Sequence, residues 1–438
     1  MNATTATGAT ALMLAARAGD PEGVSRLIAS GANVNVKEAA YGQTPLMVAA
    51  GHDRAEVVTL LLARGADASI TSAVADLRAL TAPSDADRRP QPAAAAPERA
   101  DIAGSTRPFR YTELIGAQGG LTALHFAARQ GSARAVRALL AGGAHVNAVS
   151  PADRATPLVV AIINGHFDIA AALLERGADP NAVTEAGVSP LYATLNVQWA
   201  PIAAYPQPRA HLQQSRTYLD LLTLLLDKGA DPNARVNRKV WYSSYNFDQS
   251  SVDEAGATPF WRAAYASDVE AMTLLVARGA DSSIPTMKTP PRRNPEDPTQ
   301  PSGDSSGLPP LPIGGPHVTP LHAAAGVGYG FGFAGNSHHV APGGMLAAVK
   351  YLVEEAGQDV NARDADGNTA AHHAASRGDN AMLLYLVSKG ATVTSVNRAG
   401  QTTVDLANGP VQRVQPFPET IALLEKLGAR NNHKCVSC

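Results

Sequence analysis

The sequence predicts an all-α solenoid, built from about nine two-helix repeats that each end in a β-hairpin and are interrupted by long loop insertions. Two observations lead to this fold class. A short Thr-Pro-Leu-like motif recurs, with 34 residues between Thr10 and Thr44 and again between Thr122 and Thr156. The composition is 5% aromatic and contains 38 glycines and 31 prolines, which is typical of short helices separated by frequent turns.

The motif opens nine segments of the chain, and the interval is 33 or 34 residues wherever nothing is inserted. A fixed period of this length is the signature of a stacked repeat array rather than of a single globular core. The nine segments begin at Thr10, Thr44, Thr122, Thr156, Ser189, Thr258, Thr319, Thr369 and Thr402.

Each element of the repeat follows from its residues, as the segment that begins at Thr156 shows. Thr156 can cap a helix whose first residue, Pro157, needs no amide donor. Gly165 can adopt the left-handed backbone that ends this helix. The apolar stripe Ile169, Ala172, Leu173 and Leu174 predicts a second helix, which ends at Gly177. Neither helix buries its apolar face alone, so stability depends on stacking against the next repeat.

The residues 319–324, with the sequence TPLHAA, and 177–181, with the sequence GADPN, resemble the signature of ankyrin repeats. The resemblance covers Gly8 to Ala429 and implies an ankyrin-repeat solenoid. It further implies a non-catalytic scaffold that binds its partner along a concave face made by hairpin tips and first helices. Asp53 and Ser267 depart from the pattern where a glycine should end the first helix, and we expect these corners to be tighter or irregular.

Three histidines occupy the fourth place of the signature. The resemblance implies that each forms a hydrogen bond with the threonine that caps its helix, which is a structural role. They are His125, His322 and His372.

The repeat boundaries divide the chain into two blocks of repeats, one large insertion, four smaller ones and a tail. Residues 1–70 hold repeats 1 and 2, and residues 120–429 hold repeats 3 to 9. The large insertion is 71–119, the smaller ones are 197–217, 235–255, 285–318 and 328–345, and the tail is 430–438.

Two insertions have compositions that cannot form a core. Residues 71–119 are polar and broken by proline, so we expect them to be mostly disordered. Residues 285–318 are rich in proline among charged residues. A flexible loop is the simpler interpretation, and a polyproline-like partner site is the alternative.

The insertion 235–255 differs, because Trp241, Tyr242, Tyr245 and Phe247 lie within seven residues of a chain poor in aromatics. Exposed aromatic side chains bury much area at low entropic cost, which makes them typical anchors of interfaces. This loop is therefore the best candidate for partner contact. The alternative is that the four rings fold back onto the adjacent repeat.

A second candidate is a mixed apolar and cationic strip on the first helices, at positions that stacking does not require. Such a strip suits a peptide partner, although single apolar residues on a surface need no special explanation. The strip comprises Phe126, Arg129, Val160, Arg262, Tyr265, His373 and Arg377.

Motifs for catalysis or cofactors are weak. Residues 330–335 fit G-x-G-x-x-G, but a nucleotide site needs a preceding strand, and here a helix precedes, so a flexible loop is favoured. His338 and His339, near His317, lack regular metal-ligand spacing and thiolates. Nucleophile elbow, zinc-protease and phosphate-loop motifs are absent. We therefore expect no enzyme activity and no bound metal.

Charge and hydropathy narrow the range of partners. Lys and Arg number 36 and Asp and Glu 38, so no overall field attracts nucleic acid. The longest apolar stretches are far shorter than the roughly 20 residues of a membrane-spanning helix. We expect a monomer that binds a protein or peptide and does not insert into a membrane. The preference for Arg over Lys and the abundance of Ala and Gly suggest a bacterial source.

The tail holds both cysteines, Cys435 and Cys438, at C-x-x-C spacing. It resembles the start of the C-x-x-C-H motif that attaches haem in c-type cytochromes, but the histidine is missing. Some bacterial multi-ankyrin proteins carry such a segment and are exported. One alternative is therefore an exported haem-bearing electron-transfer or sensor protein truncated after Cys438, for which a periplasmic location is favoured over a cytoplasmic one. A plain tail and a redox-active or metal-binding dithiol are the others, and no cofactor is expected unless histidine follows Cys438.

Overall fold

The computed structural model describes residues 4–81, 102–105, 107–200, 209–240, 252–290, 304, 306–329, 339–409 and 415–435. These residues form two compact units, the first with five helix pairs and the second with four. The nine pairs confirm the all-α repeat fold. None of the helices in this part of the chain is long and apolar enough to cross a membrane.

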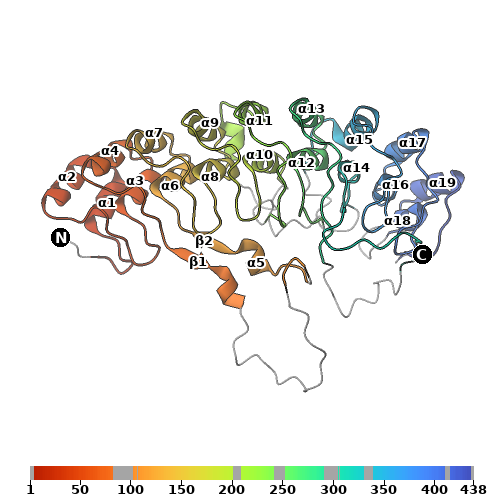
Figure 1. Cartoon of the computed structure of the whole chain (residues 1–438), viewed down its shortest axis with the longest axis horizontal. Helices are drawn as coiled ribbons and strands as arrows, with labels where there is room; N and C mark the ends of the chain where they lie inside the picture. The colour runs from red at the N-terminus through yellow and green to blue at the C-terminus, as the bar shows by residue number, and fades with distance from the viewer. Residues whose placement is uncertain are drawn as a thin grey trace, which may run out of the picture. The chain divides into compact units, whose positions relative to one another are not determined.

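In the first unit, the first helices of successive repeats contact one another in one row and the second helices form a row beside them (Figure 1). The first row rests on apolar residues such as Leu46, Leu124 and Leu158, all buried. The helix pairs are α1 (Ala11–Ala18) and α2 (Pro21–Ala29), α3 (Pro45–Gly51) and α4 (Ala55–Ala63), α6 (Ala123–Gln130) and α7 (Ala133–Ala141), α8 (Pro157–Ile163) and α9 (Phe167–Glu175), and α10 (Pro190–Gln198) and α11 (Tyr218–Asp227).

The second unit repeats this pattern four times, and it also includes Trp199 and the segment that ends at Arg110. Its core contains large buried rings, among them Phe260 and Trp261. The pairs are α12 (Pro259–Tyr265) and α13 (Val269–Ala277), α14 (Pro320–Ala324) and α15 (Gly344–Glu354), α16 (Ala370–Ala375) and α17 (Asn380–Ser388), and α18 (Thr403–Ala407) and α19 (Pro418–Lys426).

The start and end signals of the helices act as the sequence predicts. The Thr156 side chain accepts a hydrogen bond from the amide of Val159 at 3.4 Å, and Pro157 is the first residue of α8. Gly165 follows the helix with a φ of 77°. In the second helix Ala170 and Ala171 are buried, whereas the predicted Ala172 is only half-buried.

The two corners without glycine are not irregular. Asp53 and Ser267 have φ values of 55° and 58°, close to those of the glycine corners. At Asp53 the conformation is supported by its carboxylate, which accepts hydrogen bonds from Arg134 Nε and from the amide of Ala135, each at 2.8 Å. The expectation of irregular corners is therefore wrong, because stacking imposes the left-handed backbone whatever the residue.

An asparagine near the hairpin links most repeats to the next. Asn147 Nδ2 donates to the carbonyl of Gly177 at 3.1 Å, and its Oδ1 accepts from the amide of Asp179 at 2.8 Å. Ser69 and Ser283 occupy the same place in two repeats, and their hydroxyls bond to Asp67 and Asp281 instead. Four further asparagines make the same two bonds: Asn35, Asn181, Asn233 and Asn361.

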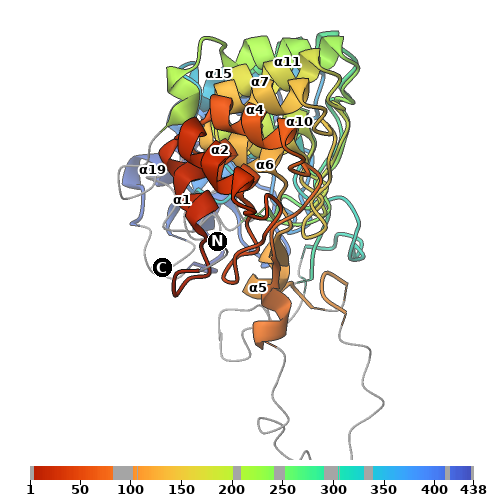
Figure 2. The same cartoon turned by 90° about the vertical axis from the view of Figure 1, so that its left-hand side faces the viewer.

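The described ends of the insertion 71–119 form secondary structure, while its middle, where disorder is expected, lies outside the described residues. Strand β1 (Val74–Asp76) pairs antiparallel with β2 (Ala117–Gly119), and the amide of Ser72 donates to the carbonyl of Leu121 at 2.9 Å. A 3-10 helix (Leu77–Thr81) follows β1, and α5 (Tyr111–Ile115) precedes β2. Figure 2 shows α5 on the hairpin side of the first unit, away from α4 and α7. The hairpin ladder simply continues into the insertion.

The insertion 197–217 carries a 3-10 helix (Ala210–Gln213). It packs against the preceding repeat, since the carboxylate of Asp168 in α9 accepts hydrogen bonds from the amides of Ser215 and Arg216 at 2.8 and 3.0 Å.

Candidate binding site

The bases of two neighbouring insertions form a hairpin ladder in the second unit. The amide of Thr286 donates to the carbonyl of Val318 at 2.9 Å, and the amide of Lys288 to that of Gly315 at 2.8 Å. The amide of Met287 bonds to the carbonyl of Ala255, at the end of the preceding insertion, at 2.7 Å. The described part of 285–318 is therefore a hydrogen-bonded extension of the hairpin, while residues 291–303, which hold part of its prolines, lie outside the described residues.

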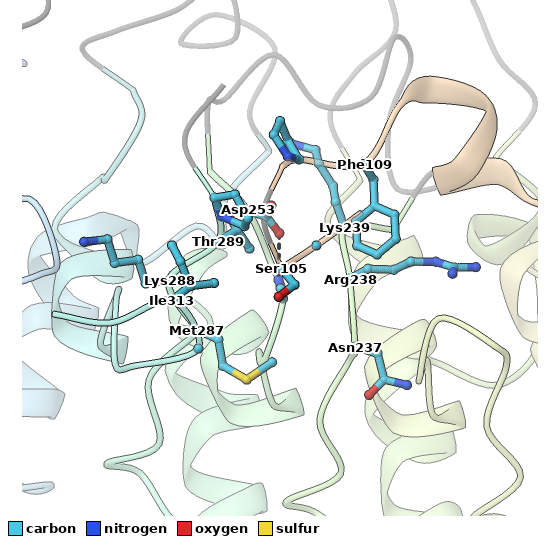
Figure 3. Close-up of a pocket in the computed structure, with 15 residues that line it drawn as sticks. Ser105, Phe109, Asn237, Arg238, Lys239, Asp253, Met287, Lys288, Thr289 and Ile313 are labelled. Atoms are coloured by element: carbon cyan, nitrogen blue, oxygen red, sulfur yellow. Dashed lines mark hydrogen bonds between the residues drawn. The ribbon is translucent and has the colours of Figure 1, made fainter. Parts of the chain in front are cut away.

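A cavity of about 310 Å³ lies between these extensions (Figure 3). Its lining comes from three stretches that are far apart in the sequence: residues 104–109, residues 237–255 and residues 287–314. These are parts of the three insertions that leave from hairpin tips. All three belong to the same compact unit.

Cationic and apolar groups share the lining. The guanidinium of Arg238 lies 5.7 Å from the centre of the Phe109 ring, within cation–π range. Lys239 is buried and its Nζ donates to the carbonyl of Val252 at 2.8 Å. Lys288 Nζ donates to the carbonyl of Leu311 at 3.0 Å. The ammonium groups are thus oriented by backbone carbonyls.

Asp253 is the acidic residue of the lining. Its Oδ1 accepts a hydrogen bond from the amide of Ala255 at 3.0 Å, which closes a tight turn. In Figure 3 Asp253 and Thr289 lie between Arg238 on one side and Lys288 on the other. The cavity therefore has a central carboxylate flanked by cations.

The aromatic cluster Trp241, Tyr242, Tyr245 and Phe247 lies outside the described residues. The residues that border this stretch are described, and Lys239 and Asp253 both line the cavity. Sequence reasoning missed Phe109, Arg238, Lys239, Asp253 and Lys288. The available signal was that the insertions share one side of the repeat, since each leaves from a hairpin tip.

The strip on the first helices is largely buried, so the prediction of a surface strip is wrong for most of it. Arg129 is exposed, with its guanidinium 4.9 Å from the centre of the Phe126 ring, and Arg377 is half-buried beside Asp379. Only these two stay candidates for partner contact. The buried members are Phe126, Val160, Arg262, Tyr265 and His373.

Arg262 illustrates the physical reason. Its Nη2 donates to the carbonyl of Trp199 at 2.9 Å, and the indole of Trp199 donates to the Asp268 carboxylate at 2.8 Å. The Tyr265 ring stacks on Trp261 at 5.2 Å between centroids. The buried side chains of Arg262 and Tyr265 are thus engaged in contacts within the fold.

The signature histidines have the predicted bonds. His125 Nδ1 contacts the Thr122 hydroxyl at 2.8 Å and accepts from the Thr122 amide at 3.2 Å, so the ring proton lies on Nε2, which donates to the carbonyl of Ala155 at 3.0 Å. His322 makes the corresponding bonds to Thr319 and Ala362. His372 bonds to Thr369 at 2.9 Å.

Burial lowers the pKa of these rings, to about 4 for His125 and His322 and to about 3 for His372. The neutral tautomer is the form that satisfies the geometry, because protonation of Nδ1 would remove the acceptor of the threonine amide. Each ring is thus a neutral element of the hydrogen-bonded core.

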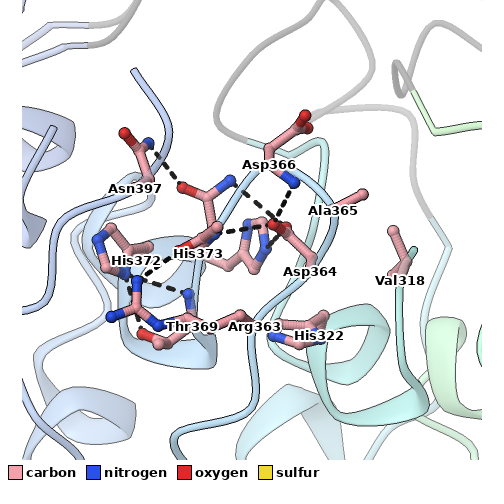
Figure 4. A network of polar contacts seen from close by, with 12 residues as sticks. Val318, His322, Arg363, Asp364, Ala365, Asp366, Thr369, His372, His373 and Asn397 are labelled. Atoms are coloured by element: carbon pink, nitrogen blue, oxygen red, sulfur yellow. Dashed lines mark hydrogen bonds and ion pairs between the residues drawn. The ribbon is translucent and has the colours of Figure 1, made fainter. Parts of the chain in front are cut away.

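A buried polar network surrounds Asp364 in the second unit (Figure 4). Its carboxylate accepts hydrogen bonds from His373 Nε2 at 3.0 Å and from the amides of Asp366 and Asn368. Burial acts to raise the pKa of Asp364, but the bond from His373 and the neighbouring histidines hold it below its usual value. Asn397 extends the network by donating to Asn368 Oδ1 at 2.9 Å. This polar network fixes the loop between two repeats.

The remaining sequence candidates lie only partly within the described residues. Residues 330–335, His338 and Cys438 lie outside the described part of the chain. His339 packs on Trp199, with ring centroids 5.3 Å apart. Among described residues, no group of three His, Cys, Asp or Glu side chains is placed to hold a metal ion. Cys435 is disulfide-bonded.

Comparisons with known proteins agree with the repeat architecture. Family models described as ankyrin repeats in three copies match residues 1–72 and 109–184, and one described as ankyrin repeats in many copies matches residues 337–387. A protein of Rickettsia felis described as an ankyrin repeat protein is 33% identical over 127 residues, which are 28% of this chain. The matched residues make up 50% of the length of that relative, so the chain spans about half of it. With nine helix pairs, the signature histidine bonds and these matches, the chain belongs to the ankyrin-repeat family.

Proposed function

We propose that this chain is a non-catalytic scaffold that binds a protein or peptide, and that its contact site is the cavity between the hairpin insertions. Ankyrin repeats generally mediate protein–protein interaction, and proteins of the family are typically not enzymes. The observation that carries the proposal is the convergence of three separate insertions on one cavity with a cationic and apolar lining. Repeat stacking alone does not require those insertions.

The insertions are the natural carriers of specificity. The positions on the first helices that were candidates for contact are mostly occupied by packing, as Arg262 and Tyr265 show. Loops held by a rigid framework are where binding residues concentrate. The aromatic residues 241–247 belong to the insertion that contributes Arg238 and Asp253, which extends the proposed contact region.

Affinity capture tests this proposal. We expect Phe109→Ser, and separately the change of Trp241, Tyr242, Tyr245 and Phe247 to Ser, to reduce the recovery of partners by the full chain. Tyr41→Ser is the matched control, because Tyr41 is an aromatic residue of a hairpin tip in the other unit and is 68% exposed. Recovery that is equal for all variants would exclude this site.

A further inference from the structure

We propose that the first three repeats bind an acidic peptide segment across α1, α3 and α6, with one carboxylate on Arg17, a second on Arg129 and an apolar side chain of the peptide between them. This surface lies in the first unit, so the inference goes beyond the cavity of the second unit and does not depend on it. Its basis is two arginines that no described residue neutralises, an apolar row beside them and an open place at Gly51.

Arg129 has no anionic partner among the described residues. Its guanidinium lies 4.9 Å from the centre of the Phe126 ring, which is within cation–π range, and its side chain forms no ion pair or hydrogen bond with the part of the chain that the structure describes. Burial lowers the pKa of Arg129. The ring thus holds a partly desolvated but exposed charge in a fixed place, which a carboxylate of a ligand would stabilise.

Arg17 occupies the same place in α1 as Arg129 in α6, seven residues after the threonine that caps each helix. It is exposed, and no described residue forms an ion pair with it. Arg54 Nε donates to the carbonyl of Arg17 at 3.0 Å, which brings a further positive charge close by. The corresponding residue of α3, the helix between α1 and α6 in the row, is Gly51 (Figure 1). Neighbouring helix axes are about 8–10 Å apart, so Arg17 and Arg129 are roughly 16–20 Å apart.

An apolar row runs beside the two cations. Leu14, Val48 and Phe126 each lie four residues after a capping threonine, one helical turn before the row of Arg17, Gly51 and Arg129, and therefore on the same helix face. Leu14 is 52% exposed, Val48 is half-buried and Phe126 is covered by the arginine. An exposed apolar side chain beside a cation fits a partner that is itself both apolar and charged.

The glycine between the cations leaves room for a side chain of the partner. A Cβ atom at Gly51 would meet Gln130 Cγ and Phe126 Cδ1, both at 4.0 Å, which is ordinary van der Waals contact. Gly51 is the last residue of α3 and its φ is not positive, so the backbone does not require glycine there. An apolar side chain of the ligand therefore fits between the two arginines, beside the Phe126 ring.

The spacing favours a peptide over a nucleic acid. A nucleic-acid strand carries one negative charge about every 3.4 Å along its axis, and proteins that follow it use a continuous positively charged groove. Here a glycine separates the two cations and an apolar row flanks them. In an extended peptide, residues six positions apart point to the same side and lie about 20 Å apart, which matches the separation of the arginines. The fitting ligand has glutamates six positions apart with an apolar residue between them.

The experiment measures the fluorescence anisotropy of two labelled peptides of identical composition with the full chain. One peptide has two glutamates six positions apart around a leucine, and the other has the two glutamates adjacent, so that they cannot reach both arginines at once. The spaced peptide should bind at least about threefold more tightly, and added salt should weaken its binding. Arg17→Gln should abolish the difference between the peptides, and Arg129→Gln should weaken both about fivefold.

Two further variants separate charge from shape. Gly51→Leu fills the open place without a change of charge and should weaken the binding of the spaced peptide about threefold. Arg137→Gln is the matched control, because Arg137 is an exposed arginine of α7 in the same unit and has no ion pair with a described residue. It should leave both affinities unchanged. Thermal melts verify that each variant is folded.

Equal affinity for the two peptides, no binding of either, or equal effects of Arg137→Gln and Arg17→Gln would overturn the inference. It would also be overturned if a single-stranded oligonucleotide bound more tightly than the spaced peptide, because the surface would then recognise phosphates. None of these outcomes bears on the cavity of the second unit, whose test is the capture experiment with Phe109→Ser.

Discussion

At the scale of single residues, the left-handed corners at Asp53 and Ser267 show how stacking overrides local preference. Ser267 is buried and has a φ of 58°, a conformation that costs an L-residue roughly 1–2 kcal/mol and glycine almost nothing. Ser267→Gly should therefore raise the free energy of unfolding by about 1 kcal/mol, as measured by chemical denaturation. A decrease would show that the serine side chain contributes more than the backbone strain costs.

The matched change at the other corner should not raise the free energy of unfolding. Asp53→Gly relieves the same backbone strain but removes the carboxylate that accepts from Arg134 and from the amide of Ala135. A capping bond of this kind contributes about 1 kcal/mol, so we expect no gain, or a net loss, in the same denaturation experiment.

The asparagine bridges give a second prediction at this scale. Asn147→Ala removes one bond to Gly177 and one to Asp179 of the next repeat, and should lower the free energy of unfolding by about 1–2 kcal/mol. Asn147→Asp keeps the acceptor for the Asp179 amide and should lie between the two proteins. Equal stability of all three proteins would contradict a bridging role.

Sequence reasoning correctly assigned the residues whose partners are near in the chain. Thr122 and His125 are three residues apart, so the cap and its histidine are visible in the motif. The bridge from Asn147 ends 30 residues away at Gly177, so the sequence showed only a turn there.

At the scale of elements, the insertions are extensions of hairpins that neighbouring repeats hold in place. Arg398 connects the insertion 285–318 to the loop between repeats, since its Nε donates to the carbonyl of Ala365 at 2.8 Å and its Nη2 to that of Pro309 at 2.6 Å. It also forms an ion pair with Asp304. One side chain thus links the described end of the insertion to the repeats.

Arg398→Ala should release this end of the insertion. Hydrogen exchange followed by mass spectrometry should show faster exchange of the amides in residues 306–315, with the helices α16 and α17 unchanged. Lys389→Ala is the control, because Lys389 makes an exposed ion pair with Glu354 away from the insertion. Unchanged exchange in residues 306–315 would show that the backbone ladder alone holds the segment.

Composition could not reveal this order. The stretches 71–119 and 285–318 are polar and rich in proline, which is typical of disorder. Their ordered parts depend on pairing between residues more than 25 positions apart, such as Val74 with Gly119 and Thr286 with Val318. The helices, in contrast, follow from periodicity within a single turn or two, and all nine pairs were predicted.

At the scale of the whole molecule, the buried neutral histidines make stability depend on pH. His125, His322 and His372 have a pKa of about 4, 4 and 3 in the folded chain, and an ordinary value near 6.5 when unfolded. Between these values only the unfolded state takes up the protons, so stability should fall as the pH drops from about 6.5 to about 4. Each ring contributes at most about 3 kcal/mol.

Denaturant titrations at a series of pH values measure this dependence, and His125→Met isolates one ring. Methionine stands at the same place in another repeat, where Met47 Sδ accepts from the Thr44 amide. The variant should lose less stability than the parent between neutral pH and pH 4.5. Burial raises the pKa of Asp366, so this residue changes the stability with pH in the opposite direction to the histidines. Its contribution is the same in both proteins and cancels when the stability curve of the variant is subtracted from that of the parent. Identical curves would exclude His125 as a source.

The placement of all the between-repeat insertions at hairpin tips has a consequence for how such a protein can change. The stacking faces and the tips occupy different parts of each unit of 33 or so residues, so a tip can lengthen or vary without altering the helix interfaces. The Phe109 and Arg238 segments already come from different repeats. A lineage of this chain could therefore acquire a new partner by exchanging one insertion, while its thermal stability and repeat number are inherited unchanged.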